Sequence, residues 1–332
     1  LTLSIAETPV SVVIPTWNRR ALLERLLKQL IAQSHPIAEV IVVDNGSTDG
    51  SAELAEQEQC RVIRFDTNQG FARAVNEGVR QAESEWVVIL NNDVAIPPDW
   101  LGRMMAGLAE TPGASFATGK LYRPGTNVLD GTFDLLAASG CAWRAGNGQE
   151  DSAAWSGQRA IPLLPLTAAV CRRQLFEDLG YLDQEFESYL EDVEFSLRAA
   201  MAGARGVYIP QAIAWHEGSA TLGVWHPDTV RRISRNQVLL VARHYPANWL
   251  VRYGWKVLAG QLLWGLVAAR HGAASSFLRG KLEGIRLWSK VRRPAADPER
   301  FGEFLDQSEQ EIRGLQKKTG FDRYWRVYFS LT

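Results

Sequence analysis

The stretch Glu85-Trp-Val-Val-Ile-Leu-Asn-Asn-Asp93 joins a short apolar run to a cluster of polar side chains. Its apolar and β-branched residues predict a buried strand, because a strand that is covered on both faces is continuously hydrophobic. The strand ends at Asn91, Asn92 and Asp93, whose oxygen atoms suit a hard cation that takes its other ligands from water and substrate phosphates. The same residue types also favour turns. By itself, the stretch leaves a turn and a metal–diphosphate site as equal alternatives.

Strand and helix patterns alternate on the amino-terminal side of this stretch. The apolar spacing predicts strands over 10–14, 39–43 and 61–65 and helices over 20–33, 51–59 and 70–82. Such alternation indicates an α/β fold, in which helices cover both faces of a mostly parallel, Rossmann-like sheet.

The pattern becomes less regular on the carboxyl-terminal side. We expect further strands over 115–121, 163–171 and 206–209 and helices over 173–179 and 192–202. A long irregular insert over 122–158, rich in Gly, Ala and Asp, is expected to contain short strands and to shape a substrate pocket.

The net charge of −1 conceals a strong asymmetry along the chain. Residues 231–293 contain thirteen Lys or Arg and a single acid, Glu283, which gives a local charge of +12 and leaves −1 − 12 = −13 for the rest. Such a split predicts an anionic partner for this region, either a membrane or a nucleic acid. The remaining composition, with 46% hydrophobic and 22% charged residues, is typical of a soluble globular protein.

Tryptophan and leucine interleave with the basic residues of this region at helical spacing, which is typical of helices in a membrane interface. No recognised nucleic-acid-binding module accompanies them, so we expect no nucleic acid partner. A packed helical appendage with a solvated basic face is the other alternative. The apolar run 257–269 is too short to span a bilayer.

The three cysteines, Cys60, Cys141 and Cys171, have neither CxxC spacing nor neighbouring histidines, which predicts reduced and mostly buried thiols in a cytosolic protein. No signal-peptide pattern opens the chain, although a start at Leu1 suggests a trimmed or engineered terminus.

Polar residues follow several of the predicted strands. If the strands are parallel, Thr16, Asp44, Asn68 and residues 91–93 share one edge of the sheet, and a nucleotide can lie along it. Asp44 could accept a hydrogen bond from a pyrimidine N–H there. Neither GxGxxG nor GxxxxGK[ST] occurs in the first sixty residues, which argues against a dinucleotide cofactor or a P-loop.

At these positions the chain resembles the family 2 glycosyltransferases, and most of all the rhamnosyltransferase-like branch of bacterial surface polysaccharide synthesis. The resemblance covers residues 10–245. It rests on motifs at 12–18, 42–50, 68–78, 90–93, 180–183, 189–198 and 216–219, in the expected order. Asn91 stands where the family usually has the first Asp of its DXD motif.

The resemblance implies a GT-A fold, a nucleotide-sugar donor and inversion at the anomeric carbon. The expected domains are a GT-A nucleotide-sugar-binding and catalytic domain over 8–228 and a basic, amphipathic, membrane-associated helical region over 229–332. By position in the motifs, the implied nucleotide-binding residues are Pro15, Thr16, Asp44, Asn76 and Asn91.

Asp93 and His216 would bind the metal, Mg²⁺ or Mn²⁺, on the donor diphosphate. His35, His226, His244 and His271 lack such a context, and we interpret them as structural.

The Glu191-Asp192 pair is the expected source of the catalytic base, since direct displacement needs a carboxylate to accept the acceptor's hydroxyl proton. Family position assigns the base to Asp192. Glu191 then serves the acceptor or supports Asp192, because adjacent helical residues point in different directions. The alternative is that both acids only start a helix, where the helix dipole favours them.

These inferences predict an inverting, metal-dependent transferase of O-antigen or cell-wall polysaccharide biosynthesis. It would move rhamnose or a hexose from dTDP-rhamnose or a UDP-sugar to a glycan or a polyprenyl-diphosphate-linked acceptor. The expected location is the cytoplasm, with peripheral attachment to the anionic inner face of the cell membrane. A catalytically degenerate nucleotide-sugar-binding scaffold and a nucleotidyltransferase are the alternatives. The aromatic run 324–329 predicts an internal clasp or a homodimer contact.

Overall fold

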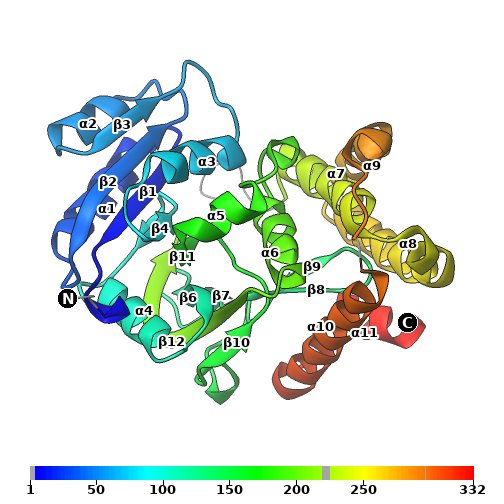
Figure 1. Ribbon diagram of the computed structural model, residues 1–332. Helices are drawn as coiled ribbons and strands as arrows, with labels where there is room; N and C mark the ends of the chain where they lie inside the picture. The colour runs from blue at the N-terminus through cyan, green and yellow to red at the C-terminus, as the bar shows by residue number, and fades with distance from the viewer. Residues whose placement is uncertain (1–3, 219–224, 296) are drawn as a thin grey trace. The chain divides into compact units, whose positions relative to one another are not determined.

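A computed structural model describes residues 4–218, 225–295 and 297–332, which divide into two compact units (Figure 1). The first, here called the sheet unit, comprises Leu1–Phe133 and Gly146–Gly218. The second, the helical unit, comprises Asp134–Ala145 and Ser219–Thr332.

Two general expectations concern the whole chain. None of the helices in the described ranges combines the length and the hydropathy that a membrane crossing requires. Cys60, Cys141 and Cys171 are free thiols, and the last two are buried, as expected.

The sheet unit alternates strands and helices along most of its length. Its elements are β1 (Val10–Thr16), α1 (Arg20–Ile31), β2 (Ile37–Asp44), α2 (Ser51–Gln57), β3 (Arg61–Arg64), α3 (Phe71–Gln81), β4 (Trp86–Leu90), β5 (Val94–Ala95), α4 (Trp100–Ala109), β6 (Ala114–Tyr122), β7 (Leu129–Gly131), β10 (Arg159–Ile161), β11 (Ala168–Arg172), α5 (Arg173–Leu179), α6 (Glu191–Met201) and β12 (Arg205–His216).

The helical unit contains a hairpin and a run of helices. Its elements are β8 (Asp134–Leu136), β9 (Ala142–Arg144), α7 (Pro227–His244), α8 (Ala247–Arg270), α9 (Ala274–Val291), α10 (Pro298–Thr319) and α11 (Arg323–Leu331).

The direction of the strands determines which loops meet. The sheet has the order β10-β12-β6-β11-β4-β1-β2-β3, with β5 paired to β12 and β7 to β6. The run from β4 to β3 is parallel, whereas β11 is antiparallel to both β4 and β6. Because β11 reverses direction, β6 and its parallel neighbour β12 run the same way as β1 and β4. The sheet is therefore mixed, and β1, β2, β4, β6 and β12 all end at one edge, here called the carboxyl edge.

The central strands β1, β4 and β11 are buried on both faces, as their continuous apolar runs predict. Val12 and Ile14 of β1 join one hydrophobic core with α1 and α4. Val13, which points the opposite way, packs against Gly78 of α3. The α/β layering expected from the sequence is thus present.

The irregular insert does contain short strands, but they belong to different units. The strand β7 pairs with β6 in the sheet unit. The hairpin β8–β9 groups with the helices because its backbone N–H groups find acceptors on α10. Leu136 N–H donates to Ser308 Oγ at 2.9 Å, and Ala138 N–H donates to Glu309 Oε1 at 2.9 Å. The domain boundary at residue 228 that the sequence suggests does not separate this hairpin from the sheet unit.

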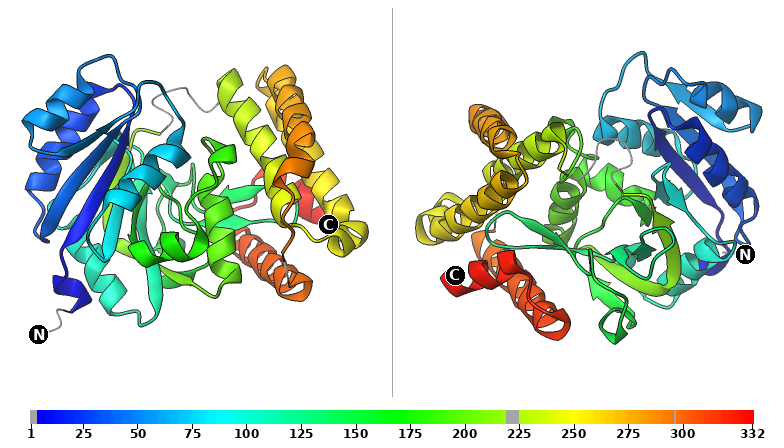
Figure 2. Two further views of the ribbon diagram at one scale, coloured as in Figure 1. Left: turned by 45° about the horizontal axis from the view of Figure 1, so that its top comes forward. Right: turned by 180° about the vertical axis from the view of Figure 1, so that it is seen from behind.

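The helices of the helical unit pack closely, with α9 beside both α7 and α8 (Figure 2). The aromatic run 324–329 lies in α11 and forms an internal clasp. Tyr324 Oη donates to the Gly260 carbonyl at 3.1 Å, and Tyr328 Oη donates to Glu309 Oε1 at 2.5 Å. Trp325 is buried beside them.

The contact between α3 and β1 gives a test of the core. A Cβ added at Gly78 would lie 2.3 Å from Val13 Cγ1. Replacing a helical glycine by alanine normally stabilises a protein by up to about 1 kcal/mol. Overpacking costs about 1–3 kcal/mol, so we expect Gly78→Ala to lower the free energy of unfolding in urea. Gly102→Ala in α4, where the new Cβ meets only Ser34 Oγ at 3.4 Å, is the control and should not lower it. Equal effects in the two variants would contradict the packing.

Candidate active site

The first part of the site lies where β1 and β2 end. Parallel pairing places Pro15 beside Val43 and Thr16 beside Asp44, and the Thr16 carbonyl accepts from Asn45 N–H at 2.7 Å. The Asp44 carboxylate is buried and accepts from Ser47 N–H at 3.3 Å. The structure thus brings together three of the predicted nucleotide-binding residues.

Asn45 connects this corner to the next loop, and the sequence alone assigned it no role. Its side-chain amide donates to Asn68 Oδ1 and to the Gly70 carbonyl, each at 3.1 Å, and its Oδ1 accepts from Gln69 N–H at 2.7 Å. These bonds hold the loop after β3 against the end of β2. A buried asparagine directly after Asp44 is the signal that could have indicated this role.

Asn76 lies in a different environment from the other predicted nucleotide-binding residues. Its amide donates to the Leu182 carbonyl at 2.8 Å, and its Oδ1 accepts from Leu182 N–H at 2.9 Å. These two bonds engage both ends of its buried amide and tie α3 to the segment after α5, while a nucleotide-binding role for Asn76 stays a prediction.

The residues Asn91, Asn92 and Asp93 form a turn, which Val94 N–H closes by donating to the Asn91 carbonyl at 3.2 Å. The turn leads directly into β5, and β5 pairs with the end of β12 so that Val94 lies opposite His216. Glu217 N–H also donates to the Asp93 carbonyl at 3.2 Å. A turn and a metal–diphosphate site are therefore compatible at this stretch, because the turn itself brings Asp93 beside His216.

His216 lies between two carboxylates. Its Nε2 is 3.2 Å from Asp93 Oδ1, and its Nδ1 is 2.8 Å from Asp130 Oδ2. All three residues are buried. Burial lowers the pKa of His216, but hydrogen bonds and charge from Asp130 and Asp93 outweigh it and raise the pKa to about 9.

Asp130 was not predicted from the sequence. It lies on β7, within the insert that shows no period, and it reaches the site only because β7 pairs with the end of β6. No local motif marks it.

The residues present fit a divalent cation. Asp93 Oδ1 is buried and lies 3.2 Å from His216 Nε2, so both atoms face the same point. The Asp130 carboxylate accepts a hydrogen bond from His216 Nδ1, the arrangement that leaves Nε2 of a neutral imidazole to bind metal. Within the described ranges, no group of three or more His, Cys, Asp or Glu side chains forms a metal cage. Two protein donors suit a cation whose other ligands are water and substrate phosphates.

The loop before α6 is strained and is held by hydrogen bonds. Glu187, Tyr189 and Leu190 have positive φ values of 56°, 72° and 64°, which are costly for residues other than glycine. Ala72 N–H at the start of α3 donates to the Glu187 carbonyl at 2.9 Å. Strain of this kind clusters at functional sites.

The loop presents the acid pair in the first turn of α6. Glu191 is buried, whereas Asp192 is partly exposed, so Asp192 is the acid of the pair that an acceptor could reach. Ser196 of the same helix accepts from Leu164 N–H at 2.9 Å. The segment after Leu164 continues to Thr167, whose carbonyl accepts from Asn91 N–H at 2.9 Å. The helix is therefore tied to the carboxyl edge through this segment.

Comparison with known proteins identifies relatives by sequence. The family model described as Glycosyl transferase family 2 matches residues 11–180. An uncharacterized protein of Sinorhizobium fredii is 30% identical over 68% of this chain and 26% of its own length. N-acetylglucosaminyl-diphospho-decaprenol L-rhamnosyltransferase of Mycobacterium tuberculosis is 26% identical over 76% of this chain and 89% of its own. Poly-beta-1,6-N-acetyl-D-glucosamine synthase of Staphylococcus epidermidis is 23% identical over 71% and 57%. The chain thus spans a quarter to somewhat over half of two of these relatives.

Solved structures share the fold. GalNAc-T7, in a complex with UDP, GalNAc and Mn²⁺, superimposes with a TM-score of 0.63 at 15% identity, over 92% of this chain and 57% of its own. The mannosyltransferase PcManGT of Pyrobaculum calidifontis, with GDP-Man and Mn²⁺, superimposes with a TM-score of 0.53 at 18% identity, over 98% and 86%. The expected GT-A fold is confirmed.

The role of Asp130 can be tested by metal binding. If Asp130 orients His216, Asp130→Asn weakens Mn²⁺ binding by about 10- to 100-fold, as loss of such an outer partner usually does. Electron paramagnetic resonance of free Mn²⁺ measures the affinity. Asp99→Asn, on the surface of the same unit and ion-paired with Arg103, is the control and should bind like the parent. Unchanged affinity in Asp130→Asn would exclude the role.

The pKa of His216 predicts a pH dependence of the metal-free fold. The folded pKa, about 9, lies above the ordinary 6.5, so the charged imidazole contributes its full stability below pH 6.5, and this contribution is lost as the pH rises through 9. In urea unfolding, the stability difference between the parent and His216→Gln should shrink across that window. A difference that stays constant with pH would refute the assignment. Since metal binds the neutral imidazole, Mn²⁺ affinity should rise over the same window.

Proposed function

This chain belongs to glycosyl transferase family 2, and from that membership we propose that it moves a hexosyl or rhamnosyl group, with inversion, from a nucleotide-diphosphate donor to an acceptor hydroxyl. The observation that carries the proposal is the pairing of buried Asp93 with His216 at the same sheet edge as Asp44. A nucleoside at Asp44 and a diphosphate at Asp93 would span that edge.

Residues at the ends of β1, β2 and β4 would bind the nucleoside. Asp44 accepts a base N–H, and Thr16 lies beside it in the sheet. Asn91 Oδ1 is a buried acceptor without a hydrogen-bond partner in the described chain. A ribose hydroxyl would supply the missing donor, which gives Asn91 a neutral binding role in place of the usual acid.

The Asp93–His216 pair would bind the diphosphate through a cation. These two side chains would hold Mg²⁺ or Mn²⁺, and Asp130 keeps the imidazole of His216 in the required orientation. When bound, the cation would offset the negative charge that builds on the departing diphosphate. The Mn²⁺ in the GalNAc-T7 and PcManGT complexes supports a divalent ion in this fold.

Asp192 is the proposed base. Direct displacement at the anomeric carbon needs one carboxylate that accepts the acceptor's hydroxyl proton as the new bond forms. Asp192 is partly exposed at the start of α6, next to the strained loop. Buried Glu191 supports the helix start beside it.

The acceptor is proposed to be a glycan, or a lipid-linked glycan of cell-surface polysaccharide synthesis. The M. tuberculosis relative is named for a decaprenol-diphosphate-linked substrate and for L-rhamnose, which favours a polyprenyl-diphosphate acceptor and dTDP-rhamnose. A UDP-hexose is the alternative donor. Such an acceptor would place the protein at the anionic inner face of the cell membrane.

Replacing Asp192 separates an enzyme from a degenerate scaffold. We expect Asp192→Asn to lower kcat by about 10²- to 10⁴-fold, because a general base contributes that much. Donor binding should be unchanged, since Asp44 and Asp93 are intact. A panel of nucleotide sugars, scored by the rise in Tm with Mn²⁺, selects the donor and measures its binding in each variant.

Glu185→Gln, in the short helical turn Gln184–Phe186 that precedes α6, is the matched control and should retain activity. Equal turnover in Asp192→Asn and the parent would remove Asp192 from the mechanism. Donor binding without transfer by the parent, across the acceptor panel, would favour the scaffold.

A further inference from the structure

The helices α8 and α9 expose large apolar side chains in two regular rows. The apolar stripe, as we call these rows together, consists of residues that are 47% to 90% exposed: Val251, Trp255, Leu258, Leu262 and Leu266 on α8, and Leu278, Leu282 and Ile285 on α9. Their spacing of three or four residues places each row on one side of its helix. Single exposed leucines are ordinary, but contiguous rows of this kind mark an interaction surface.

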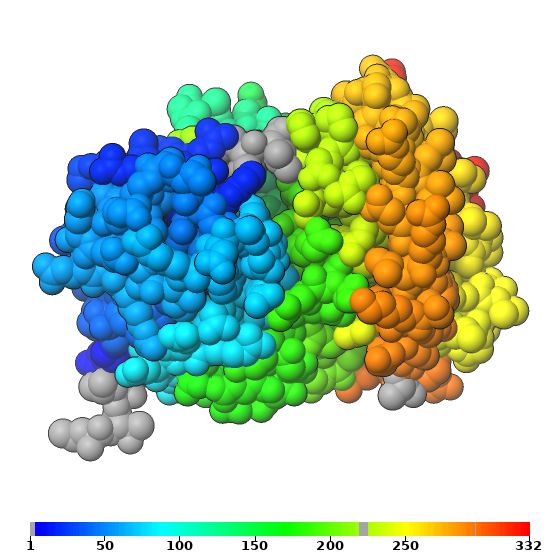
Figure 3. Space-filling model, turned by 90° about the horizontal axis from the view of Figure 1, so that it is seen from above, coloured from blue at the N-terminus to red at the C-terminus, as the bar shows by residue number. Residues whose placement is uncertain are grey.

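The helix α9 buries small residues and exposes large apolar ones, which is the reverse of an ordinary surface helix. Its small residues Gly280 and Gly284 are buried against α7, where a Cβ added at Gly280 would lie 2.2 Å from the Arg231 carbonyl oxygen. The leucines lie on the opposite side and face solvent. Figure 3 shows α9 (orange) exposed along its length. Packing within the helical unit therefore does not explain why these exposed positions are apolar.

The helix α8 shows the same arrangement. It buries only Trp249, Gly260 and Ala268 among its residues. It meets α9 at Gly265, where an added Cβ would lie 2.8 Å from the Phe277 ring. Both rows reach this contact, because Leu266 directly follows Gly265 and Leu278 directly follows Phe277 in the chain. With 24 and 18 residues, the helices are about 36 and 27 Å long, so the two rows together form an extended surface.

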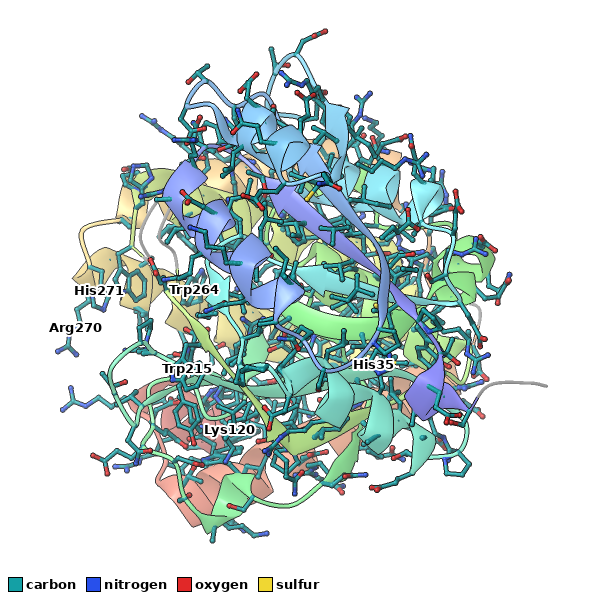
Figure 4. The ribbon with its side chains drawn as sticks, turned by 90° about the vertical axis from the view of Figure 1, so that its left-hand side faces the viewer. His35, Lys120, Trp215, Trp264, Arg270 and His271 are labelled. Carbon is teal, nitrogen blue, oxygen red and sulfur yellow. The ribbon has the colours of Figure 1, made fainter. Side chains whose placement is uncertain are left out.

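Basic side chains border the apolar stripe. Residues 247–293 contain nine Lys or Arg and one acid, 9 − 1 = +8. The single acid, Glu283, is ion-paired with Arg231 at 2.6 Å. Arg252, Arg279 and Arg286 are exposed, and Arg270 projects from the end of α8 (Figure 4).

We propose that the apolar stripe and its basic border are a docking surface for an anionic lipid bilayer. The leucines enter the boundary between headgroups and acyl chains, Trp255 lies at headgroup level, and the arginines contact lipid phosphates. A second copy of the chain fits less well, because two surfaces of like charge would repel each other. A nucleic acid would use the arginines but not the leucines. The inference does not depend on the transferase activity.

Flotation with vesicles tests the surface in the full 332-residue chain. We expect binding to phosphatidylglycerol-containing vesicles and little binding to pure phosphatidylcholine. The pair Leu262→Gln and Leu282→Gln should weaken binding at least about tenfold, since each leucine loses its apolar burial. Ile31→Gln, at an apolar residue on α1 of the sheet unit that is even more exposed than the two leucines, is the matched control and should bind like the parent. All these sites are exposed, so Tm should be unchanged in each variant.

Two further measurements test the role of the basic side chains and the depth of Trp255 in the bilayer. Arg279→Gln with Arg286→Gln should weaken binding to the anionic vesicles and reduce its salt dependence. The emission spectrum of Trp255 is obtained by subtracting the spectrum of Trp255→Phe from that of the parent. It should shift to the blue on binding. Three results would overturn the proposal: leucine variants that float like the parent, leucine variants that only turn a dimer into a monomer, and RNA binding that depends on the arginines while the vesicles stay unbound.

Discussion

The pairing of β5 with the end of β12 is the contact on which the candidate site depends. The turn after β4 leads directly into β5, so the register that sets Val94 against His216 also sets Asp93 beside the imidazole. A two-residue strand is too short to be stable by itself. It is held because β12 is anchored along its length to β6, in the interior of the sheet. Any shift of β12 along β6 would move His216 away from Asp93 and Asp130 together.

The surrounding loops are fixed by polar side chains rather than by apolar packing. Asn45 bonds the loop after β3, Asn76 bonds the segment after α5, and Ser196 bonds the segment before β11. Each is a buried amide or hydroxyl with partners in a neighbouring loop, and leaving such a group unpaired is costly. The polar groups at the carboxyl edge thus form a connected scaffold, and the strained backbone before α6 is held within it.

The helical unit uses glycine for the opposite purpose. Gly280 and Gly284 allow α9 to approach α7 closely, so that the small residues fill the interior and the large ones remain outside. Glu309 of α10 accepts hydrogen bonds from Ala138 N–H and from Tyr328 Oη. These bonds tie the hairpin β8–β9 and the helix α11 to the same bundle. The apolar stripe is therefore left for a partner outside the unit.

Periodicity in the sequence was enough to predict β1 to β4 and the helices α1 to α3 between them, because each buried element repeats its apolar residues at its own period. Parallel order then places Thr16, Asp44 and Asp93 at one edge of the sheet. The sequence could not identify Asp130, since β7 has no pattern of its own and is placed by pairing with β6. Nor could it show that Asn76 bonds the Leu182 backbone, or that the leucines of α9 face outward. Local pattern depends on residues that are near in the chain, whereas these features depend on contacts between distant segments, which only the tertiary structure decides.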